Sequence, residues 1–345
     1  MKQTIVGAGI SGLSCAIQLE NLGLNTCLIE KNKESHKLCG GLLTYKAYKE
    51  LEKITDSTSL LGAIETTMKD VEIIAKNGKK WDVQMKNPMY IIDKTKLIKL
   101  LRANEYKGEL IYTENYKIHE NDINAAGLNN AYNKCLGFKL NNDNKKCFGL
   151  QIDIYNWDYR QNNITIEFSN KFKGYYWKFP LKTGIRVGMG SDYTNAKERI
   201  EYLSLFTEYL DKKGYKYKMQ DIKGGFLPNG PCKYIENTIG DACGMVNCLT
   251  GEGMYYGIKQ GILLANLIYW KRKFNNLSIE TLQDHYCKEE QKVEFYKKSL
   301  NQLKNLQQNS YLIKKLFYSK LGQIIFPICS KKFIENFVNF VNEKF

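Results

Sequence analysis

The sequence has 345 residues, of which 43% are hydrophobic and 25% charged, so it is long enough for one large or two interleaved domains. This balance excludes a disordered chain, and no apolar run approaches the ~20 residues of a membrane-spanning helix. The net charge of +15 comes mostly from Lys, since Arg occurs only five times. Without an Arg cluster or a recognised motif, nucleic acid is excluded as the partner, whereas anionic lipid head groups or an acidic partner suit the basic surface.

The ten cysteines are scattered, and no CxxC pair occurs among them. This spacing argues against a zinc site and against a secreted disulfide framework. No secretion signal is expected at the N-terminus, because a strand and a glycine loop begin there at once. We therefore expect a cytoplasmic protein with no metal.

The chain opens with a short apolar run, Thr4–Val6, which predicts a buried strand. Gly7, Gly9 and Gly12 follow it at the spacing GxGxxG. In such a loop the first glycine permits a tight turn, the second lets the backbone approach a pyrophosphate, and the third lets a helix pack on the strand. The spacing therefore predicts a dinucleotide site.

The segments after the loop supply the rest of this pattern. A helix is expected over Leu13–Leu22, so the N–H groups of the loop, including those at Ile10 and Ser11, face the phosphates. A second strand over Asn25–Ile29 ends at Glu30. An acid about 20 residues beyond the loop is the expected partner of the adenosine ribose. Strand, loop, helix and acid together predict a Rossmann-type unit.

A second loop near residue 241 distinguishes between dinucleotides. It contains Gly240–Gly244, then Leu249–Met254, and then an apolar helix through Trp270. Asp241 can accept hydrogen bonds from ribityl hydroxyls, and the N-terminus of the helix can stabilise negative charge on a reduced flavin. NAD has no ribityl chain, so the two loops together indicate FAD. The residues expected at the cofactor from this part of the chain are Asp241, Gly251, Gly253 and Met254.

With these motifs the chain resembles the geranylgeranyl reductase family of flavoproteins, within the p-hydroxybenzoate hydroxylase-like group. The resemblance also rests on Lys37–Gly41, on Tyr175–Pro180, which fits the pattern YxWxFP, and on Gly224–Pro231. It runs in order from residue 1 to about residue 275. It implies further FAD contacts at Lys31, Lys37, Gly40, Gly41 and Leu42.

The family reaction that the resemblance implies is hydride transfer from reduced FAD to a C=C bond of a prenyl chain. Cys39 is then a catalytic candidate beside the flavin, or else a small packing residue. The aromatic strand is expected to wall an apolar tunnel, with Tyr175 and Trp177 also catalytic candidates. The expected substrate-binding residues are Tyr175, Trp177, Phe179 and Pro180, and a well-packed strand core is the alternative interpretation of all four.

The sequence departs from the family pattern at two positions. The segment Asn124–Gly127 aligns with a GADG-like motif but carries Ala126 where the motif has Asp. Cys248 stands where a proline is common. These differences concern the electron donor and individual flavin contacts, and leave both main FAD loops intact. NAD(P)H, a reduced flavin and ferredoxin all stay open as the electron donor.

Two alternative functions stay open beside the isoprenoid reductase. One is an FAD-dependent monooxygenase or halogenase-like enzyme acting on a small aromatic or apolar metabolite. Halogenases carry a related WxWxIP motif, but Tyr175 replaces its first Trp. The other is a non-catalytic prenyl-binding escort protein, against which the Asp241 loop argues.

The predicted fold is α/β, with a Rossmann-like FAD-binding domain interleaved with an antiparallel β-sheet substrate domain and followed by a helical C-terminal segment. We assign residues 1–60, 93–140 and 225–278 to the first domain, 61–92 and 141–224 to the second, and 279–345 to the last. A helix is expected over Lys94–Asn104, carrying Arg102 as a phosphate or flavin-edge contact or as a solvated charge.

The end of the chain predicts an amphipathic helix over Ser330–Phe345. Its apolar positions are Phe333, Ile334, Phe337, Val338, Val341 and Phe345, and lysines flank that face. Packing against the body of the protein is the simplest interpretation. A lid over an apolar pocket and a peripheral membrane contact are the alternatives.

Overall fold

The structure is a computed structural model. It describes residues 2–33, 37–116, 119–128, 146–156, 163–193, 197–230, 236–275, 282–319, 322, 326 and 329–344. The predicted contacts of Val341 and Phe345 lie outside the side chains described.

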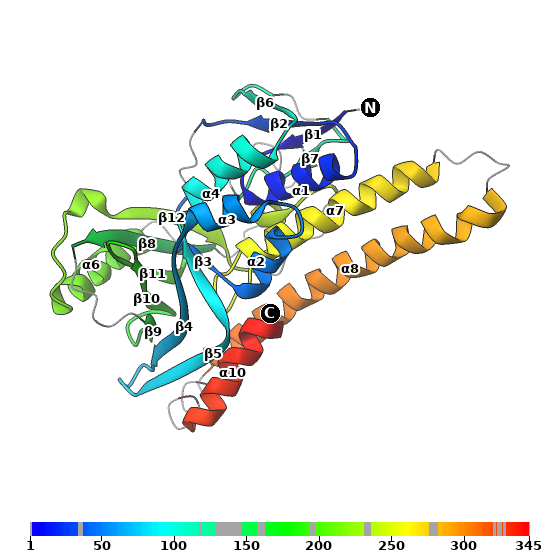
Figure 1. The fold of residues 1–345 in the computed structure, drawn as a ribbon. Coiled ribbons are helices and arrows are strands. Elements are labelled where there is room, and N and C mark those ends of the chain that lie inside the picture. Colours follow the sequence, from blue (N-terminus) through cyan, green and yellow to red (C-terminus); the bar gives the residue numbers. More distant parts are fainter. Residues whose placement is uncertain are drawn as a thin grey trace.

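A four-stranded parallel sheet forms the N-terminal part of the fold, at the top of Figure 1. Its strands, in spatial order, are β6 (Glu109–Tyr112), β2 (Thr26–Glu30), β1 (Gln3–Val6) and β7 (Ile123–Asn124). The sequence therefore placed both of its first strands correctly, to within a residue. The helix after the glycine loop, α1 (Ile10–Asn21), begins three residues earlier than the sequence predicted, inside the GxGxxG motif.

Two glycines of α7 (Met254–Asn275) allow that helix to lie directly on the start of α1. A Cβ at Gly257 would stand 2.2 Å from Ser11 Oγ, and one at Gly261 would stand 2.7 Å from the Ser11 carbonyl oxygen. Both distances are too short for a Cβ. At Gly261 the contact is with the backbone of α1, so the approach of the two backbones there depends on glycine, whereas at Gly257 it is with the Ser11 side chain. Segments about 245 positions apart in sequence are thereby held in contact.

Three short helices pack into the same hydrophobic core as α1: α2 (Tyr45–Leu51), α3 (Ser57–Ala63) and α4 (Lys94–Leu100). The predicted helix Lys94–Asn104 is confirmed up to Leu100, where it passes into a π-helical turn over Leu101–Glu105. Asp56 and Asp93 cap α3 and α4 by accepting hydrogen bonds from backbone N–H groups.

The second sheet has eight strands, and seven of them come from the predicted substrate domain or its borders. In spatial order they are β12 (Lys223–Pro228), β8 (Lys146–Tyr155), β11 (Gly184–Tyr193), β10 (Gly174–Leu181), β9 (Ile164–Phe168), β4 (Ile64–Ile74), β5 (Lys80–Ile92) and β3 (Leu42–Leu43).

The prediction of an antiparallel sheet is wrong at one point. β4 and β9 are parallel, with Val71 opposite Ile164, while every other neighbouring pair in this sheet is antiparallel. The reason is topological: β4 and β9 come from separate stretches of the chain, so no hairpin dictates their relative direction. The boundaries that we assigned to the domains stay a prediction.

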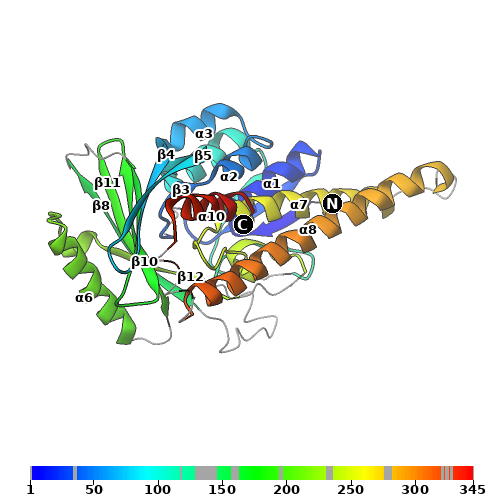
Figure 2. The same cartoon turned by 90° about the horizontal axis from the view of Figure 1, so that it is seen from below.

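Helix α6 (Lys197–Lys212) covers the outer side of β8 and β11, away from the parallel sheet (Figure 2). Its buried face includes Phe206, which is fully enclosed, and Tyr209, whose ring stacks on Tyr176 with centroids 3.8 Å apart. The buried face of α6 is therefore part of the hydrophobic core beneath this side of the sheet.

Two further helices end the chain. The 36-residue α8 (Leu282–Phe317) runs beside α7, and α10 (Lys331–Lys344) lies against β5, as Figures 1 and 2 both show. Ile334 is fully buried in the core of the eight-stranded sheet, so the packing interpretation of the last helix is confirmed. Phe333 on the same helix is 53% exposed. A membrane contact by α10 stays a prediction.

None of the helices in the described part of the chain has the length and apolar character required to cross a membrane.

We predict that Ile334→Ala lowers the free energy of unfolding by about 2–5 kcal/mol, because the truncation leaves a cavity under α10. Phe333→Ala is the matched control on the same helix. Its side chain is already half in water, so the cost should stay below about 1 kcal/mol. Urea unfolding of both variants measures the two losses of free energy of unfolding. Equal losses would mean that α10 does not pack as described.

Candidate functional site

One cavity of about 1630 Å³ brings the sequence motifs together. Typical small-molecule pockets occupy ~300–1,000 Å³, so this cavity has room for a large ligand and a second one beside it. Most residues singled out from the sequence line it. They are Gly7, Gly9, Ile10, Ser11, Glu30, Lys31, Lys37, Cys39, Gly40, Gly41, Leu42, Arg102, Tyr175, Trp177, Phe179, Asp241, Gly251, Gly253 and Met254.

Two predicted residues do not line the cavity. Gly12 lies behind the wall, where a Cβ would stand 1.9 Å from the Gly7 carbonyl oxygen, which is the close helix-on-strand packing expected of it. Pro180 lies at the far end of the aromatic strand, and its carbonyl accepts a hydrogen bond from Thr66 Oγ1 at 2.7 Å. The structure therefore gives Pro180 no place in the wall of the cavity.

The glycine loop has the geometry of an anion site. Gly7 has a φ of +107°, which a residue with a side chain rarely adopts. A Cβ at Gly9 would meet nothing within 4 Å, so open space lies beside this backbone. Helix α1 begins there with no side-chain cap and no acid in its first turn. Its free N–H groups and positive dipole end are therefore available to a phosphate in the cavity.

Glu30 and Arg102 hold this loop in place. The Glu30 carboxylate accepts hydrogen bonds from the backbone N–H groups of Ala8 and Lys31, both at 2.8 Å. Arg102 donates to the carbonyls of Ala8, at 2.8 Å, and Lys33, at 3.1 Å, and lies 3.7 Å from Glu30. Arg102 therefore stabilises the glycine loop and also lines the cavity. Its side chain is largely shielded from solvent, so the interpretation as a solvated charge is wrong.

On the other side of the cavity, Lys37 and Asp241 form an ion pair. Asp241 belongs to a tight turn, Gly240–Cys243, which ends at Gly244 with a φ of +80°. Burial and the nearby positive charge of Lys94 lower the pKa of Lys37, and the Cys39 thiol opposes that shift. The pair links the Lys37–Gly41 segment to the Asp241 loop.

Arg186, which the sequence analysis did not identify, fixes the backbone of the Cys39 segment. Its guanidinium donates to the Gly40 carbonyl at 3.2 Å and to the Ile92 carbonyl at 3.3 Å. Asp153, directly opposite on β8, accepts two hydrogen bonds from Arg186, at 2.8 and 2.9 Å. This bidentate pair orients the guanidinium, and so holds the loop that places Cys39 at the cavity.

Glu252 is a second residue that the sequence analysis passed over, although it stands inside the predicted motif. It lines the cavity and accepts a hydrogen bond from Thr44 Oγ1 at 2.5 Å. Burial raises the pKa of Glu252 above its ordinary value, and the Lys46 ammonium, 4.0 Å away, opposes this shift. The signal in the sequence that could have identified Glu252 is its position between Gly251 and Gly253, inside the predicted motif.

The cavity continues into an apolar part that we call the aromatic branch. Trp177 stacks on Phe179 with ring centroids 6.2 Å apart, and Tyr175 lies edge-on to Trp177 at 6.0 Å. Tyr175 donates its hydroxyl hydrogen to the Thr250 carbonyl at 2.5 Å, which ties the strand to the second loop. The other walls of the aromatic branch are Val71, Ile73, Met85, Met89, Ile164, Ile166, Phe168, Phe317, Phe326, Phe337 and Val338.

The two departures from the family pattern also lie at the cavity. Ala125, Ala126 and Gly127 line it, and the carbonyl oxygen of Ala125 stands 2.4 Å from the position of a Cβ on Gly7. Cys248 donates from its thiol to the Gly230 carbonyl at 3.4 Å, and its backbone N–H donates to Ser310 Oγ at 3.0 Å. The Cys248 segment is therefore held by α8, which carries no family motif.

Comparisons with known proteins agree with this geometry. Residues 5–53 match the family described as NAD(P)-binding Rossmann-like domain. The chain is 26% identical over 337 residues to the digeranylgeranylglycerophospholipid reductase of Methanococcus vannielii, covering 87% of this chain and 84% of the relative. It is 24% identical to the protein of that name in Methanocaldococcus jannaschii, covering 97% and 94%.

Solved structures share the fold. A geranylgeranyl bacteriochlorophyll reductase-like protein from Thermoplasma acidophilum superposes with a TM-score of 0.68 at 20% identity, covering 99% of this chain and 92% of that one. The flavin-dependent brominase Bmp2 superposes with a TM-score of 0.69 at 14% identity, covering 99% and 94%. The predicted fold class and the resemblance to geranylgeranyl reductases are confirmed, and the protein is an oxidoreductase.

The position of Trp177 depends on Gly188, its partner across the β10–β11 pair. A Cβ at Gly188 would stand 2.2 Å from Trp177 Cζ2, so we predict that Gly188→Ala displaces the indole and costs about 1–3 kcal/mol of stability. Gly190→Ala is the control, since its Cβ would lie 3.5 Å from the same ring. Thermal unfolding and near-ultraviolet circular dichroism measure both effects. A change as large in the control would argue against this packing.

Proposed function

We propose that this relative of the geranylgeranyl reductases is an FAD-dependent enzyme that reduces C=C bonds of an isoprenoid or another apolar substrate. The observation that carries the proposal is the single cavity that joins the glycine loop, the Asp241 loop and the aromatic branch. Such a cavity can place a dinucleotide and an apolar chain next to each other.

The residues around the cavity fit FAD. The uncapped start of α1 and the open space at Gly9 suit its pyrophosphate, and Glu30, at the end of β2, lies where the adenosine ribose is expected. Asp241 and Lys37 both line the cavity. We expect Asp241 to accept hydrogen bonds from the ribityl chain, and Lys37 to meet a phosphate once it leaves Asp241. The start of α7 would face the flavin.

Bound FAD, in its reduced form, would supply a hydride to one carbon of the alkene, a proton from nearby water would complete the reduction at the other carbon, and the protein supplies the surroundings. Trp177 and Phe179 present stacked apolar faces, which exclude water and limit the orientation of a flat, unsaturated chain. Arg186 fixes the Cys39 segment at the side of the cavity where the isoalloxazine is expected. The stacked rings and the fixed backbone keep the reacting bond and the cofactor in one arrangement, which is the main contribution that positioning makes to rate.

The composition of the aromatic branch supports an apolar substrate. Its walls contain aliphatic and aromatic side chains from β4, β5, β9 and both C-terminal helices. Phe317, Phe326 and Phe337 form a contiguous aromatic group, with Phe317 and Phe326 centroids 4.7 Å apart. A prenyl chain of matching length would bury apolar surface there, at about 25 cal/mol per Å². The lid interpretation of α10 is supported by the same contacts, since Phe337 and Val338 are part of the wall.

Two other functions are compatible with the same scaffold. A monooxygenase or halogenase-like enzyme would consume oxygen and return an oxygenated or halogenated product, whereas a reductase works without oxygen. An escort protein would bind the prenyl chain without any flavin. The electron donor is proposed to be NAD(P)H, reduced flavin or ferredoxin, and product analysis with each donor in turn separates them.

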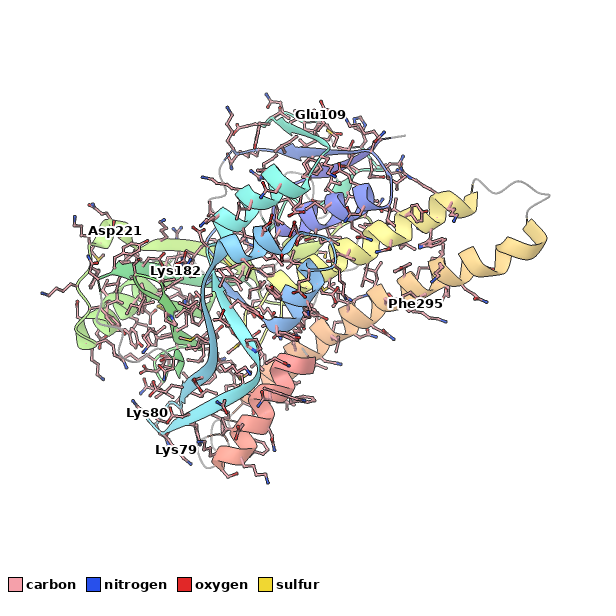
Figure 3. The ribbon with its side chains drawn as sticks, viewed as in Figure 1. Lys79, Lys80, Glu109, Lys182, Asp221 and Phe295 are labelled. Carbon is pink, nitrogen blue, oxygen red and sulfur yellow. The ribbon has the colours of Figure 1, made fainter. Side chains whose placement is uncertain are left out.

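We predict that the purified protein binds FAD one to one and binds FMN much more weakly, because FMN lacks the ADP half that the glycine loop would hold. Asp241→Asn should weaken FAD binding about tenfold, since a charged acceptor is lost. Asp221→Asn is the control, an exposed acid far from the cavity that is labelled in Figure 3. Fluorescence titration of the apoprotein measures both, and equal affinity of FMN and FAD would contradict the assignment.

Trp177→Ala is predicted to lower the rate of alkene reduction at least tenfold with little loss of bound flavin, because it opens the wall to water and leaves the chain unoriented. Trp270→Ala, on α7 and outside the cavity wall, is the control. The readout is the gain of two hydrogen atoms in a polyprenyl probe, measured by mass spectrometry under argon. A rate unchanged by Trp177→Ala would remove this residue from the substrate wall.

A further inference from the structure

One carboxyl group at the cavity has no role in the reaction described so far. Glu252 lies on the segment between the Asp241 turn and α7, and its side chain is only 11% exposed. Thr44 stands at the N-cap of α2 but makes no side-chain cap there, and its hydroxyl instead donates to Glu252 Oε1 at 2.5 Å. Both residues line the cavity. A largely buried acid therefore faces whatever ligand occupies this part of the cavity.

Next to Glu252 lies an ammonium group that has no hydrogen-bond acceptor. Lys46 Nζ is buried, makes no hydrogen bond within the part of the chain that the structure describes, and stands 4.0 Å from Glu252 Oε2. Its other neighbours are aromatic: the ring centre of Tyr255 is 4.3 Å away and that of Tyr256 is 5.9 Å away. Rings stabilise a charged ammonium without accepting a proton from it. Because little water screens the two groups, the charge of each depends strongly on the other.

The other titratable groups around this pair have partners of their own or stay neutral. From α2, α7 and the cavity side they are Glu50, Lys53, Tyr255, Tyr256, Lys259, Asp241 and Lys37. Glu50 accepts hydrogen bonds from Lys53 at 2.9 Å and from Lys259 at 2.8 Å, and Asp241 is paired with Lys37. Burial raises the pKa of Tyr255 to about 12 and that of Tyr256 further, so both phenols keep their protons.

The protonation of Glu252 is balanced between opposing effects. Burial raises the pKa of Glu252 above the ordinary value of a glutamic acid, whereas the Lys46 ammonium and the Thr44 hydrogen bond lower it. Burial lowers the pKa of Lys46, and the Glu252 carboxylate opposes that shift. A negative charge that appeared in the cavity would repel the carboxylate, so it would favour the protonated form of Glu252.

We propose that Glu252 is a redox-linked proton acceptor, whose carboxylate takes up one proton when the bound cofactor is reduced and releases it when the cofactor is reoxidised. This inference rests on the proposed function and specifies how the same site balances its charge. Two electrons that reach a flavin with only one proton leave one negative charge, which the start of α7 would face. Glu252 directly precedes that helix by two residues, and Lys46 stays charged beside it.

The protons and charges of the reaction balance when Glu252 is included. In the first half the electron donor is oxidised, the cofactor gains two electrons and one proton, and Glu252 forms an O–H bond with a second proton from solvent. In the second half the alkene is reduced, and gains a hydride at one carbon and a proton from water at the other. Glu252 then gives its proton to the hydroxide that water leaves behind. The total charge at the cavity is therefore the same before and after each half.

The pH dependence of the midpoint potential of bound flavin tests this proposal without any alkene. FAD-loaded protein is reduced and reoxidised in a spectroelectrochemical cell at a series of pH values. Between the pKa of Glu252 in the oxidised protein and its higher pKa in the reduced protein, we expect about two protons to accompany two electrons. Glu252→Gln keeps the shape of the side chain but cannot take up the proton. The slope of potential against pH should therefore fall about twofold in that window.

Lys46→Met tests the direction of the coupling. Without the ammonium the pKa of Glu252 should rise in both the oxidised and the reduced protein, so the steep part of the plot should move to higher pH without disappearing. Glu201→Gln is the matched control for the loss of a carboxylate, because Glu201 is exposed on α6 and lies outside the cavity wall. It should change neither the slope nor the position of the window. Thermal unfolding midpoints check that each variant is folded.

Infrared difference spectra recorded in the same cell assign the proton to the residue. The reduced-minus-oxidised spectrum of the unsubstituted protein should gain the C=O stretching band of a protonated carboxylic acid and lose carboxylate bands. Glu252→Gln should lack these changes, and Glu201→Gln should retain them. This readout separates a proton on Glu252 from one on the cofactor.

Three results would overturn the proposal. They are a difference spectrum of the unsubstituted protein without a carboxylic acid band at any pH, equal slopes for that protein and Glu252→Gln, and a shift of the steep region to lower pH in Lys46→Met. Failure of the proposed function is seen separately. Protein that binds no flavin would refute both, whereas flavin that is reduced but reacts with no alkene would refute the reductase and leave the proton uptake measurable.

Discussion

The architecture of the site depends on the close approach of α7 to the first turn of α1. At Gly257 and Gly261 the backbone of α7 lies so near Ser11 that no side chain fits between the helices. This contact fixes the Asp241 loop, which precedes α7, opposite the glycine loop, which precedes α1. The separation of the two loops across the cavity therefore depends on this close contact between the two helices.

The long-range polar contacts then complete the cavity. Arg186 reaches from the eight-stranded sheet to the Cys39 segment, Lys37 reaches to Asp241, and Tyr175 reaches to Thr250. Each of these joins the sheet or the N-terminal unit to a loop that has little regular structure of its own. Because loops are positioned by such contacts, the shape of the cavity depends on both parts of the fold being assembled.

The sequence was sufficient to predict the features that depend on residues close to one another in the chain. The GxGxxG spacing dictates the turn at Gly7, and the aromatic segment Tyr175–Pro180 was expected to be a strand, which the structure confirms as part of β10. Contacts between segments that are distant in the sequence produce no local sequence pattern, so they could not be predicted. The parallel pairing of β4 with β9 and the bracing by Arg186 both join residues that are far apart in the chain. The burial of Lys314 on α8 could not be predicted, because one lysine among many on a basic helix gives no periodic signal of burial. In the structure its ammonium donates hydrogen bonds to Asp192 and Asn229, which lie far from it in the sequence.

The visible absorption spectrum of the protein, recorded without oxygen, tests the central claim most directly. FAD-loaded protein is first reduced until its flavin absorbance is bleached, and a polyprenyl lipid is then added. The account predicts that the absorbance of oxidised flavin returns as the lipid gains hydrogen. Flavin that stays bleached with every prenyl probe, and recovers only when oxygen is admitted, would contradict an alkene reductase and favour the oxygen-dependent chemistry found on the same scaffold.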